Sequence, residues 1–560
     1  MRLIKANISI FLILLLSLAL RIYQISQVPP ALNWDEVSLG YNAYSVFKTG
    51  HDEWGNKLPT IFRAYGDYKL PAYVYISIPG IAVFGLTEFA VRLPSLVAGT
   101  LSILFTYFLV LELFDSKKHR TPYTRTFAAL SALLMAVEPW SLFTSRIALE
   151  ADIAVFFIIS GTYFFLRGLR TKNYLLFASL FFGLSVWSYN SARVFVPLFL
   201  VSLVIIYREK FLAIYKISPS TIRCSLITAL VFLVPMFWQL ARPIGQARYG
   251  EVQILDQGLI AKINEARNNG CSRLVCNKVT YFVPIFVKNY IPHFGPRFLF
   301  FEGGSNYQFS IPERGLLHLV NLPFFYLGLV MVFLKFRNYK YGRLLIVWLL
   351  LAPTASSLTR EAPHVLRSIV ILPVPMILTA LGLGFFLKKF KHLFVFVYLV
   401  LVLISLEGYM QTYFNDYRVN YSDSWQYGYK EMVGFVKENY DKYDKILITK
   451  KHGEPHEFIL FYLKWDPGNY LKDTSLVRFY QSNWWWVDGF DKFYFVNDWE
   501  ITEDRVRERK FILESKITVD CKSSKCLLIA GGQDFSGIWK KFETINFLDG
   551  DLAFEIYENI

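Results

Sequence analysis

Apolar segments of membrane-spanning length recur from residue 8 to beyond residue 400 and dominate the pattern of the chain. Such runs are typical of helices that cross a bilayer, because about 20 apolar residues are needed to span its hydrocarbon core. Short polar connections join most of them, so we expect one helical bundle. About eleven spans are predicted, at residues 8–25, 92–114, 126–143, 152–167, 173–189, 194–207, 224–241, 314–334, 344–359, 366–387 and 393–410.

The first apolar run follows Arg2 and Lys5 and also has the outline of a secretory signal peptide. Its apolar part is long for such a peptide, and Gln27-Val28-Pro29-Pro30 follows in place of the small residues of a cleavage site. We therefore interpret this run as the first membrane span.

Basic residues gather in every second connection, which sets the orientation of the chain. The positive-inside rule places these connections, and the amino terminus, on the cytoplasmic side. They account for the formal net charge of +15, so this charge does not indicate a nucleic-acid partner. Only Asp115 and Glu209 oppose the inner basic residues, which are Arg2, Lys5, Lys117, Lys118, Arg120, Arg125, Arg167, Arg170, Lys172, Arg208, Lys210, Lys216, Arg223, Lys335, Arg337, Lys340, Arg343, Lys388, Lys389 and Lys391.

Three long hydrophilic stretches then fall on the outer side, at 27–91, 242–313 and 411–560. We expect a transmembrane domain over residues 1–410, with the first two stretches as outer loops, and an extracytoplasmic α/β domain over residues 411–560. In the latter, Trp484-Trp485-Trp486 either stacks on sugar rings or fills a small core, and the second is favoured. Its predicted elements are helices at 425–440 and 457–463 and strands at 445–449, 493–496 and 526–529.

The cysteines agree with this topology. Cys271 and Cys276 lie in the second outer stretch and Cys521 and Cys526 in the third, so two local disulfides are expected, with four reduced thiols as the alternative. Cys224, at the start of an apolar span, is expected to be a buried thiol. Zinc is not expected on these cysteines, because the pairs are far apart in sequence and lack paired histidines.

Adjacent acids and a later lysine occur in the first outer loop, where the chain leaves the membrane. Asp35 and Glu36 precede a mixed amphipathic segment at 37–47, and Lys69 lies near the end of the loop. One interpretation is that Asp35 caps a short helix on the membrane surface. The other is a general base at the bilayer boundary, since ionisable groups at this depth are costly unless they are used. The residues alone leave both open.

Other outer turns also carry charged groups. Singly, each turn fits helix capping and arginines that extend to the membrane surface. Together they supply what a phosphate site and a general base need, namely cations and a carboxylate. The groups predicted to converge near one lipid headgroup are Arg146, Glu150 and Asp152 in one turn, Arg193 in the next, and Arg360, His364 and Arg367 in the last.

Three motifs carry a resemblance to a known family: Trp34-Asp35-Glu36, Tyr68-Lys69-Leu70-Pro71 and Arg92-Leu93-Pro94. With the basic inner loops, they resemble the polyprenyl-phosphate-sugar transferases of the GT-C superfamily. Within it, the chain is most similar to bacterial relatives of protein O-mannosyltransferases and to the aminoarabinose transferases of lipid A. The resemblance covers residues 1–410 and is strongest in the first 200.

The resemblance implies roles for single residues. The family's first-loop aspartate acts as a base at the acceptor, which implies that role for Asp35, with Glu36 as the second acid of the pair. The family's lysine before prolines contacts the donor phosphate, which implies Lys69. The late His-x-x-Arg element, here His364 and Arg367, is expected beside the same phosphate. Binding of the donor or acceptor sugar is expected at Arg146, Glu150 and Asp152.

A metal is not implied. Aminoarabinose transferases have a glutamate just before the lysine that can hold a metal, but the residue here is Tyr68. One proline of their Lys-Pro-Pro is also replaced, by Leu70. We therefore expect neither a metal site at this position nor a required cofactor.

The implied reaction is a single inverting displacement. Asp35 takes a proton as an acceptor hydroxyl attacks the anomeric carbon, while Lys69 with Arg193 or Arg367 stabilises the leaving polyprenyl phosphate. The expected partners are a polyprenyl-phosphate-linked sugar, a protein, glycan or lipid acceptor, and membrane lipid. The main alternative is a transporter or lipid flippase, but those proteins place charges within spans and show repeats, whereas the ionisable residues here cluster at outer ends.

Overall fold

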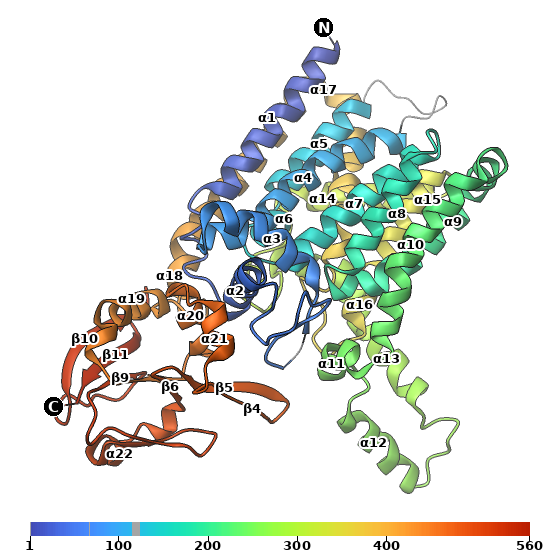
Figure 1. The fold of residues 1–560 in the computed structure, drawn as a ribbon. Helices are drawn as coiled ribbons and strands as arrows, with labels where there is room; N and C mark the ends of the chain where they lie inside the picture. The colour runs from blue at the N-terminus through green and yellow to red at the C-terminus, as the bar shows by residue number, and fades with distance from the viewer. Residues whose placement is uncertain (1, 67, 115–123, 560) are drawn as a thin grey trace. The chain divides into compact units, whose positions relative to one another are not determined.

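The computed structural model describes residues 2–66, 68–114 and 124–559 (Figure 1). Contacts divide the chain into two compact units. The first, called here the bundle unit, comprises Met1–Tyr23 and Ser95–Met410, and the second, the sheet unit, comprises Gln24–Pro94 and Gln411–Ile560. Outside the described residues lie Asp67 and the predicted inner-loop residues Asp115, Lys117, Lys118 and Arg120.

The first outer loop therefore clusters with the carboxy-terminal part of the chain and not with the helices that flank it in sequence. One division falls after Met410, at the predicted boundary, but residues Gln24–Pro94, predicted as part of the transmembrane domain, cluster with residues Gln411–Ile560. The assignment of separate functions to residues 1–410 and 411–560 stays a prediction.

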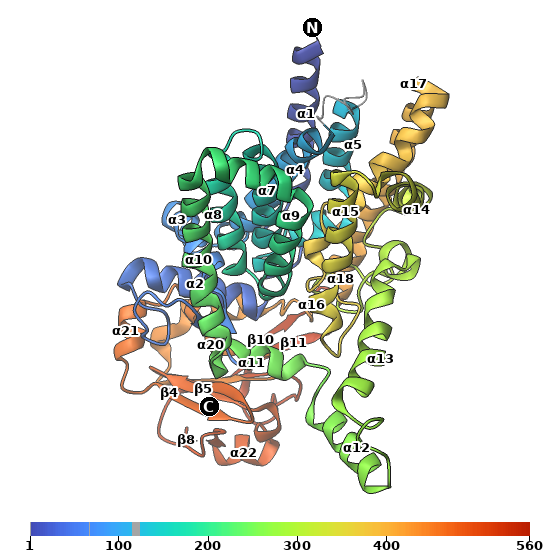
Figure 2. The ribbon, with the colours of Figure 1, turned by 90° about the vertical axis from the view of Figure 1, so that its right-hand side faces the viewer.

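The bundle unit is helical. Neighbouring helices α7 to α10 pack against one another and run side by side in both views (Figures 1 and 2). Its α-helices are α1 (Arg2–Ile22), α4 (Glu88–Phe114, which begins in the sheet unit), α5 (Thr124–Val137), α6 (Pro139–Thr144), α7 (Glu150–Gly168), α8 (Tyr174–Val186), α9 (Asn190–Ile217), α10 (Pro219–Leu240), α11 (Pro243–Val252), α12 (Gln257–Asn268), α13 (Lys278–Tyr290), α14 (Leu322–Met331), α15 (Lys340–Leu351), α16 (Thr354–Ser357) and α17 (Val374–Gln411).

Apolar helices of spanning length confirm a polytopic membrane fold. Over the described residues, six helices are long and apolar enough to cross a bilayer, and five shorter apolar helices accompany them. The predicted number of spans stays a prediction. The six long helices are Glu88–Phe114, Glu150–Gly168, Asn190–Ile217, Pro219–Leu240, Leu319–Phe336 and Leu393–Asn420.

Helix α17 covers the last two predicted spans without a break in helical assignment. The chain nevertheless turns back within it. The ring of Phe324 lies 5.7 Å from that of Phe386 and 5.6 Å from that of Tyr398, whereas a straight helix would separate residues 386 and 398 by about 18 Å. The rings of Phe386 and Phe394 also stack at 5.4 Å. Residues 374–411 therefore form two segments folded against each other, as two separate spans require.

The sheet unit is built on a seven-stranded mixed sheet with strand order β10-β11-β9-β3-β6-β5-β4. Strand β3 lies at its centre and pairs in parallel with both β6 and β9. The strands of this sheet are β3 (Lys445–Thr449), β4 (Val477–Gln481), β5 (Trp484–Phe490), β6 (Phe493–Val496), β9 (Cys526–Ala530), β10 (Lys540–Asn546) and β11 (Leu552–Glu558).

Smaller elements complete the unit. Two hairpins stand apart from the main sheet, β1-β2 and β7-β8. Their strands are β1 (Phe62–Arg63), β2 (Tyr68–Lys69), β7 (Lys510–Ile512) and β8 (Thr518–Asp520), and the α-helices are α2 (Trp34–Thr49), α3 (Pro71–Phe84), α18 (Arg418–Asn420), α19 (Tyr429–Asn439), α20 (Pro455–Tyr462), α21 (Pro467–Lys472) and α22 (Glu503–Glu508).

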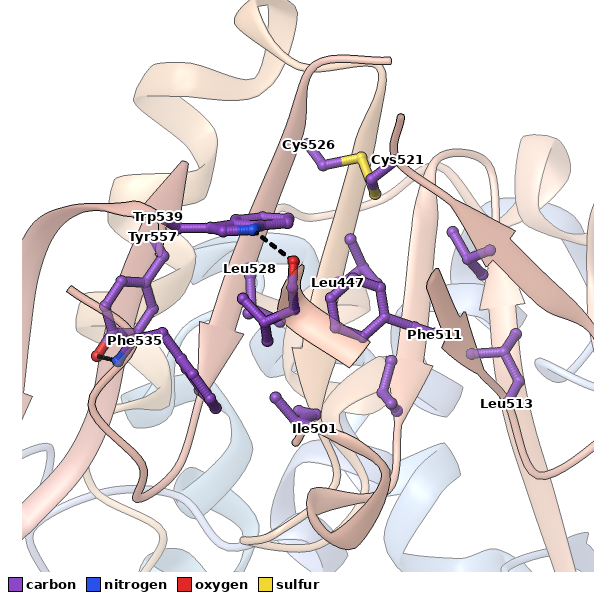
Figure 3. Close-up of a cluster of buried hydrophobic side chains, with 14 residues drawn as sticks. Leu447, Ile501, Phe511, Leu513, Cys521, Cys526, Leu528, Phe535, Trp539 and Tyr557 are labelled. Carbon is purple, nitrogen blue, oxygen red and sulfur yellow. Dashed lines mark hydrogen bonds between the residues drawn. A yellow bond between two sulfur atoms is a disulfide. The ribbon is translucent and has the colours of Figure 1, made fainter. Parts of the chain in front are cut away.

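One face of the main sheet buries an apolar core (Figure 3). Leu447 of β3 and Leu528 of β9 pack there with Trp539, whose Nε1 donates to the carbonyl of Val506 at 3.0 Å. The three predicted strands, β3, β6 and β9, are largely buried and apolar, as expected of strands that are covered on both faces.

The predicted elements of this part of the chain are confirmed at β3, β6, β9 and α20. The predicted helix at 425–440 begins later, at Tyr429, because residues 421–428 form turns.

Both predicted disulfides are present, Cys271–Cys276 and Cys521–Cys526. The expectation that Cys224 is buried is wrong, because its side chain is exposed on α10. Only Ile222, Ser225 and Met236 of that helix are buried, so α10 presents most of its apolar surface outward, as a lipid-facing helix does.

The orientation can be tested by cysteine labelling in a Cys224→Ser background, since the other four cysteines are disulfide-bonded. Gln481→Cys, in the exposed part of β4, should react with a membrane-impermeant thiol reagent in intact cells. We choose Gln481 because neighbouring Ser482 has a left-handed φ of 54°. Asn338→Cys, on the predicted inner face, should react only after the cells are opened. Reaction at 338 with protection at 481 would reverse the topology.

Candidate functional site

Helix α2 begins directly after Asn33, which is its N-cap. The Asn33 side chain accepts a hydrogen bond from the Glu36 amide at 2.9 Å, and the Glu36 carboxylate accepts one from the Asn33 amide at 3.3 Å. This reciprocal pair is a capping box. The interpretation in which Asp35 caps the helix is therefore wrong, and Asp35 is the second residue of α2.

Helix α2 is also not a surface helix. Val37, Leu39, Tyr41 and Ala43 are buried within the sheet unit. The close packing needs a glycine at residue 40, because an added Cβ would lie 2.6 Å from the Val91 side chain and 2.8 Å from the Phe461 ring. The start of α2 is therefore fixed by packing as well as by its cap.

The Glu36 carboxylate forms a buried ion pair with Arg92 of α4. Arg92 donates from Nε and Nη2 to the two carboxylate oxygens, each at 2.9 Å, and both side chains are almost fully buried. This is the bidentate arrangement that guanidinium and carboxylate groups favour. The prediction that Glu36 takes part in the chemistry disagrees with this geometry, because the carboxylate already holds the fold of the loop.

The remaining donors of Arg92 bind backbone carbonyls of the chain that leads into α2. Nη1 donates to the carbonyls of Ile25 at 2.7 Å and Pro29 at 3.2 Å, and Nη2 donates to that of Ala31 at 2.6 Å. One side chain thus organises residues 25–36.

Asp35 and Lys69, two residues of the first outer loop, form an ion pair. Lys69 Nζ lies 2.9 Å from Asp35 Oδ1, and the side chains are 22 % and 41 % exposed, respectively. Lys69 ends the β1-β2 hairpin, in which it pairs with Phe62, and directly precedes Leu70 and the start of α3. A partly exposed acid at a helix N-terminus, paired with a cation, is the arrangement expected of a reactive carboxylate.

Aromatic residues of the sheet unit hold the residue before Asp35. The Trp34 amide donates to the Gln426 side chain at 2.8 Å, and the Trp34 ring lies 6.3 Å from Tyr65 and 6.5 Å from Trp484. Gly453, at φ 113°, lets the backbone approach the Trp34 ring where a Cβ would collide with it.

The favoured interpretation of the tryptophan run, packing, fits Trp484. Its ring stacks on Tyr65 at 5.6 Å, and its Nε1 donates to Glu454 at 2.6 Å. Burial raises the pKa of Glu454 to about 7, although the hydrogen bond from Trp484 opposes this.

In the bundle unit, Arg146 closes the end of α1. Its guanidinium donates to the carbonyls of Leu20 at 2.6 Å, Arg21 at 3.1 Å and Tyr23 at 2.8 Å, and the side chain is buried. The carbonyls of a last helical turn have no partner within the helix, so this arginine completes the helix end. The predicted sugar contact by Arg146 disagrees with this position.

Arg193 has a similar place at the end of α8. Its Nε donates to the Val186 carbonyl at 3.0 Å, its Nη2 bonds the Gln239 side chain, and the guanidinium lies 5.5 Å from the Trp187 ring. It is buried, with a structural role that competes with the predicted phosphate contact.

Two predicted acids open α7. Glu150 is its first residue and is half-buried. Asp152 is buried and accepts from the Thr144 hydroxyl at 3.0 Å through Oδ1, whereas its buried Oδ2 has no hydrogen-bond partner over the described residues.

His364 lines a cavity of about 1240 Å³ in the bundle unit. Arg367 lies beside it: its amide donates to His364 Nδ1 at 3.3 Å, and its guanidinium binds Thr359 at 2.9 Å and Glu361 at 3.1 Å. The cavity also has polar residues that the sequence analysis did not single out, among them Arg297, Glu302, Asn306, Tyr307 and Glu313.

Asp35 and Lys69 belong to the sheet unit, and the other predicted site residues, apart from Glu36, belong to the bundle unit. Convergence of the two sets on one headgroup therefore stays a prediction. Sequence reasoning missed Asn33 and the role of Arg92. The spacing Asn33-x-x-Glu36 is a capping-box signal that would have found the first.

A family model and several solved structures are similar to this chain. Residues 69–238 match a family model described as dolichyl-phosphate-mannose-protein mannosyltransferase. The structure is similar to ArnT from Cupriavidus metallidurans bound to undecaprenyl phosphate, with a TM-score of 0.52 and 12 % identity over 100 % of this chain and 98 % of that one. The fold is of the GT-C type. The same protein in the apo state gives a TM-score of 0.51 at 11 % identity, again over 100 % and 98 % of the two chains.

A further solved structure is the oligosaccharyltransferase AglB from Archaeoglobus fulgidus, in complex with an inhibitory peptide and a dolichol-phosphate. It gives a TM-score of 0.48 at 13 % identity, over 82 % of this chain, which spans 63 % of that longer protein. No match was found among curated proteins. The resemblance predicted from the sequence is confirmed by the family model and by the fold.

The Glu36–Arg92 pair gives a stability prediction. Arg92→Met should lower the free energy of unfolding by about 3–5 kcal/mol, because it leaves a buried carboxylate without its cation. The double variant Glu36→Leu/Arg92→Met should regain part of that loss, because neither charge is then buried alone. Thermal unfolding in detergent measures this, with the exposed Glu431→Gln as the control. A melting temperature of Arg92→Met equal to that of the control would contradict the structural role.

Proposed function

We propose that this chain is an inverting membrane glycosyltransferase that moves a sugar from a polyprenyl-phosphate donor to an acceptor hydroxyl at the extracytoplasmic face. The Asp35–Lys69 pair, 2.9 Å apart at the start of α2, carries the proposal. The match to a mannosyltransferase family model supports the reaction class. The structure of ArnT with undecaprenyl phosphate supports the kind of donor.

Asp35 is the proposed general base. Its side chain is 41 % exposed, so an acceptor hydroxyl can reach it. Its neighbour Glu36 cannot take this role without leaving Arg92 buried and unpaired. The N-cap of α2 is Asn33, so the proposed chemistry and the helix start depend on different residues.

Lys69 is the proposed contact of the donor phosphate. A carboxylate base and a phosphate leaving group are both negative and repel each other at close range. An ammonium between them reduces this repulsion and stabilises the charge that develops on the phosphate as the sugar leaves. Half-buried Lys69, already 2.9 Å from Asp35, is in the right place for both tasks.

The reaction is one displacement. The acceptor hydroxyl gives its proton to Asp35 as its oxygen bonds to the anomeric carbon, and the bond from that carbon to the phosphate oxygen breaks on the opposite face. The electron pair leaves with the polyprenyl phosphate, whose charge Lys69 offsets. The proton on Asp35 then passes to water.

Among the other candidates, His364 and Arg367 are the next choice for the donor phosphate, because His364 lines a large cavity. Arg146 and Arg193 are less suited, since backbone carbonyls already occupy them. Glu150 and Asp152 stay candidates for the sugar. We place the protein in the cell membrane with its amino terminus in the cytoplasm and residues 411–560 outside.

Asp35→Asn tests the base. It should reduce transfer of radiolabelled sugar from polyprenyl phosphate by roughly a hundredfold or more, because the amide has nearly the same shape but accepts no proton. The melting temperature should stay that of the wild type, since Asn33 caps α2. Asp441→Asn, an exposed acid of the sheet unit, is the matched control. Full transfer by Asp35→Asn would remove this residue from the chemistry.

Lys69→Ala tests the phosphate contact. The KM for the donor should rise by roughly ten- to a hundredfold, because a charge-assisted contact is worth about 1.5–3 kcal/mol. Lys69→Arg should recover part of this, since it keeps the charge. Lys57→Ala, an exposed lysine of the same loop, serves as control. A donor KM equal to that of this control would place the phosphate elsewhere, with His364 and Arg367 next to be tested.

A further inference from the structure

Three ionisable side chains that the proposed reaction does not use gather inside the sheet unit. Glu53 comes from the first outer loop, and His456 and Glu457 come from the first turn of α20. One ligand atom of each residue lies within 4.8 Å of those of the other two. All three residues are buried, at 3 %, 2 % and 0 % exposure.

Glu53 Oε1 accepts a hydrogen bond from the Asn42 side chain at 2.9 Å, but the other two groups lack partners that buried polar atoms need. Both carboxylate oxygens of Glu457 and Nδ1 of His456 have no hydrogen-bond partner within the described part of the chain. Glu53 and Tyr65 are close enough to Glu457 to influence its carboxylate, and the Tyr65 hydroxyl has no hydrogen-bond partner within the described residues. Such orphaned atoms call for an explanation, because leaving a buried polar group unpaired is costly.

The cluster also has more negative than positive groups. Glu454 adds a third carboxylate, 3.5 Å from His456 Nδ1. Arg478, the nearby cation, is held by the Glu53 backbone carbonyl at 2.6 Å and lies 4.3 Å from the Trp54 ring. Lys450 is held by Asp488.

We propose that Glu53, His456 and Glu457 bind one divalent transition-metal ion, Zn²⁺ or Mn²⁺. One imidazole and two carboxylates are a donor set that these ions accept. Ligands about 2.1 Å from a tetrahedral cation lie about 3.4 Å apart, so ligand atoms within 4.8 Å of one another must draw closer when the ion binds.

The ion would join the first outer loop to α20. Helix α20 already contacts α2 through Phe461 and Gly40, and α2 carries Asp35. The proposed metal is therefore structural: it fixes the support of the loop and does not contact Asp35. This site also differs from Tyr68, the position where the family resemblance would place a metal.

Metal content of the full chain, purified in detergent in a Cys224→Ser background, tests the proposal. After treatment with EDTA and dialysis against Zn²⁺ or Mn²⁺, the protein should retain about one equivalent, and its melting temperature should rise by several degrees. Glu457→Gln should lose both effects while it keeps the size of the side chain. The exposed acid variant Glu431→Gln should keep both.

Two results would overturn the proposal: no retention of either metal by the unsubstituted protein, or equal retention by Glu457→Gln. If Glu457→Gln does not fold, anomalous scattering at the zinc edge from Zn²⁺-soaked crystals of the unsubstituted protein shows whether the ion binds at this site. A peak among residues 53, 456 and 457 supports the site, and a peak elsewhere or none refutes it. These readouts do not depend on sugar transfer. A protein that binds no metal can still be a glycosyltransferase, and a protein that transfers no sugar can still bind the metal.

Discussion

The buried ion pair of Glu36 and Arg92 is the constraint on which the first outer loop depends. Arg92 binds both oxygens of Glu36 and three backbone carbonyls between Ile25 and Ala31. A buried pair of this kind adds little net stability compared with apolar residues of similar volume, but removing one partner is strongly destabilising. In the observed path of residues 25–36, Glu36 and the three carbonyls engage Nε, Nη1 and Nη2 of the guanidinium, so the pair ties this segment to α4.

As a result, the adjacent acids Asp35 and Glu36 lie in different environments, one partly exposed and one buried. Neighbouring side chains on a helix point about 100° apart, so when Glu36 faces the buried Arg92, Asp35 must face another direction. That direction leads to Lys69 and to solvent-accessible surface. One carboxylate of the Asp-Glu pair thus holds the loop, and the other pairs with Lys69 nearer the surface. The capping box between Asn33 and Glu36 determines which acid faces the interior.

The features that could be predicted from the sequence are those that depend on a local pattern of residues. Apolar runs predicted the helices and the central strands β3, β6 and β9, and spacing predicted both disulfides. The sequence did not predict β4, β5, β10 and β11, whose exposed and aromatic positions blur the apolar run of a buried strand. Nor did it assign Arg146 and Arg193, because a buried arginine at a helix end and one at a phosphate site look the same in sequence.

No local pattern in the sequence predicts that Glu53 lies beside His456 and Glu457. Their proximity reflects the packing of the first outer loop against the carboxy-terminal part of the chain. The regular structure of the loop consists of α2, α3 and a hairpin of two short strands, β1 and β2. Contacts with other parts of the chain therefore fix the positions of its side chains. Gln426 binds the backbone at Trp34, Gly453 and Trp484 pack on its ring, and Phe461 packs against α2. All four come from the carboxy-terminal stretch. The start of α2, which carries the proposed base Asp35, thus rests on elements encoded about 400 residues away, where close packing can hold it in place.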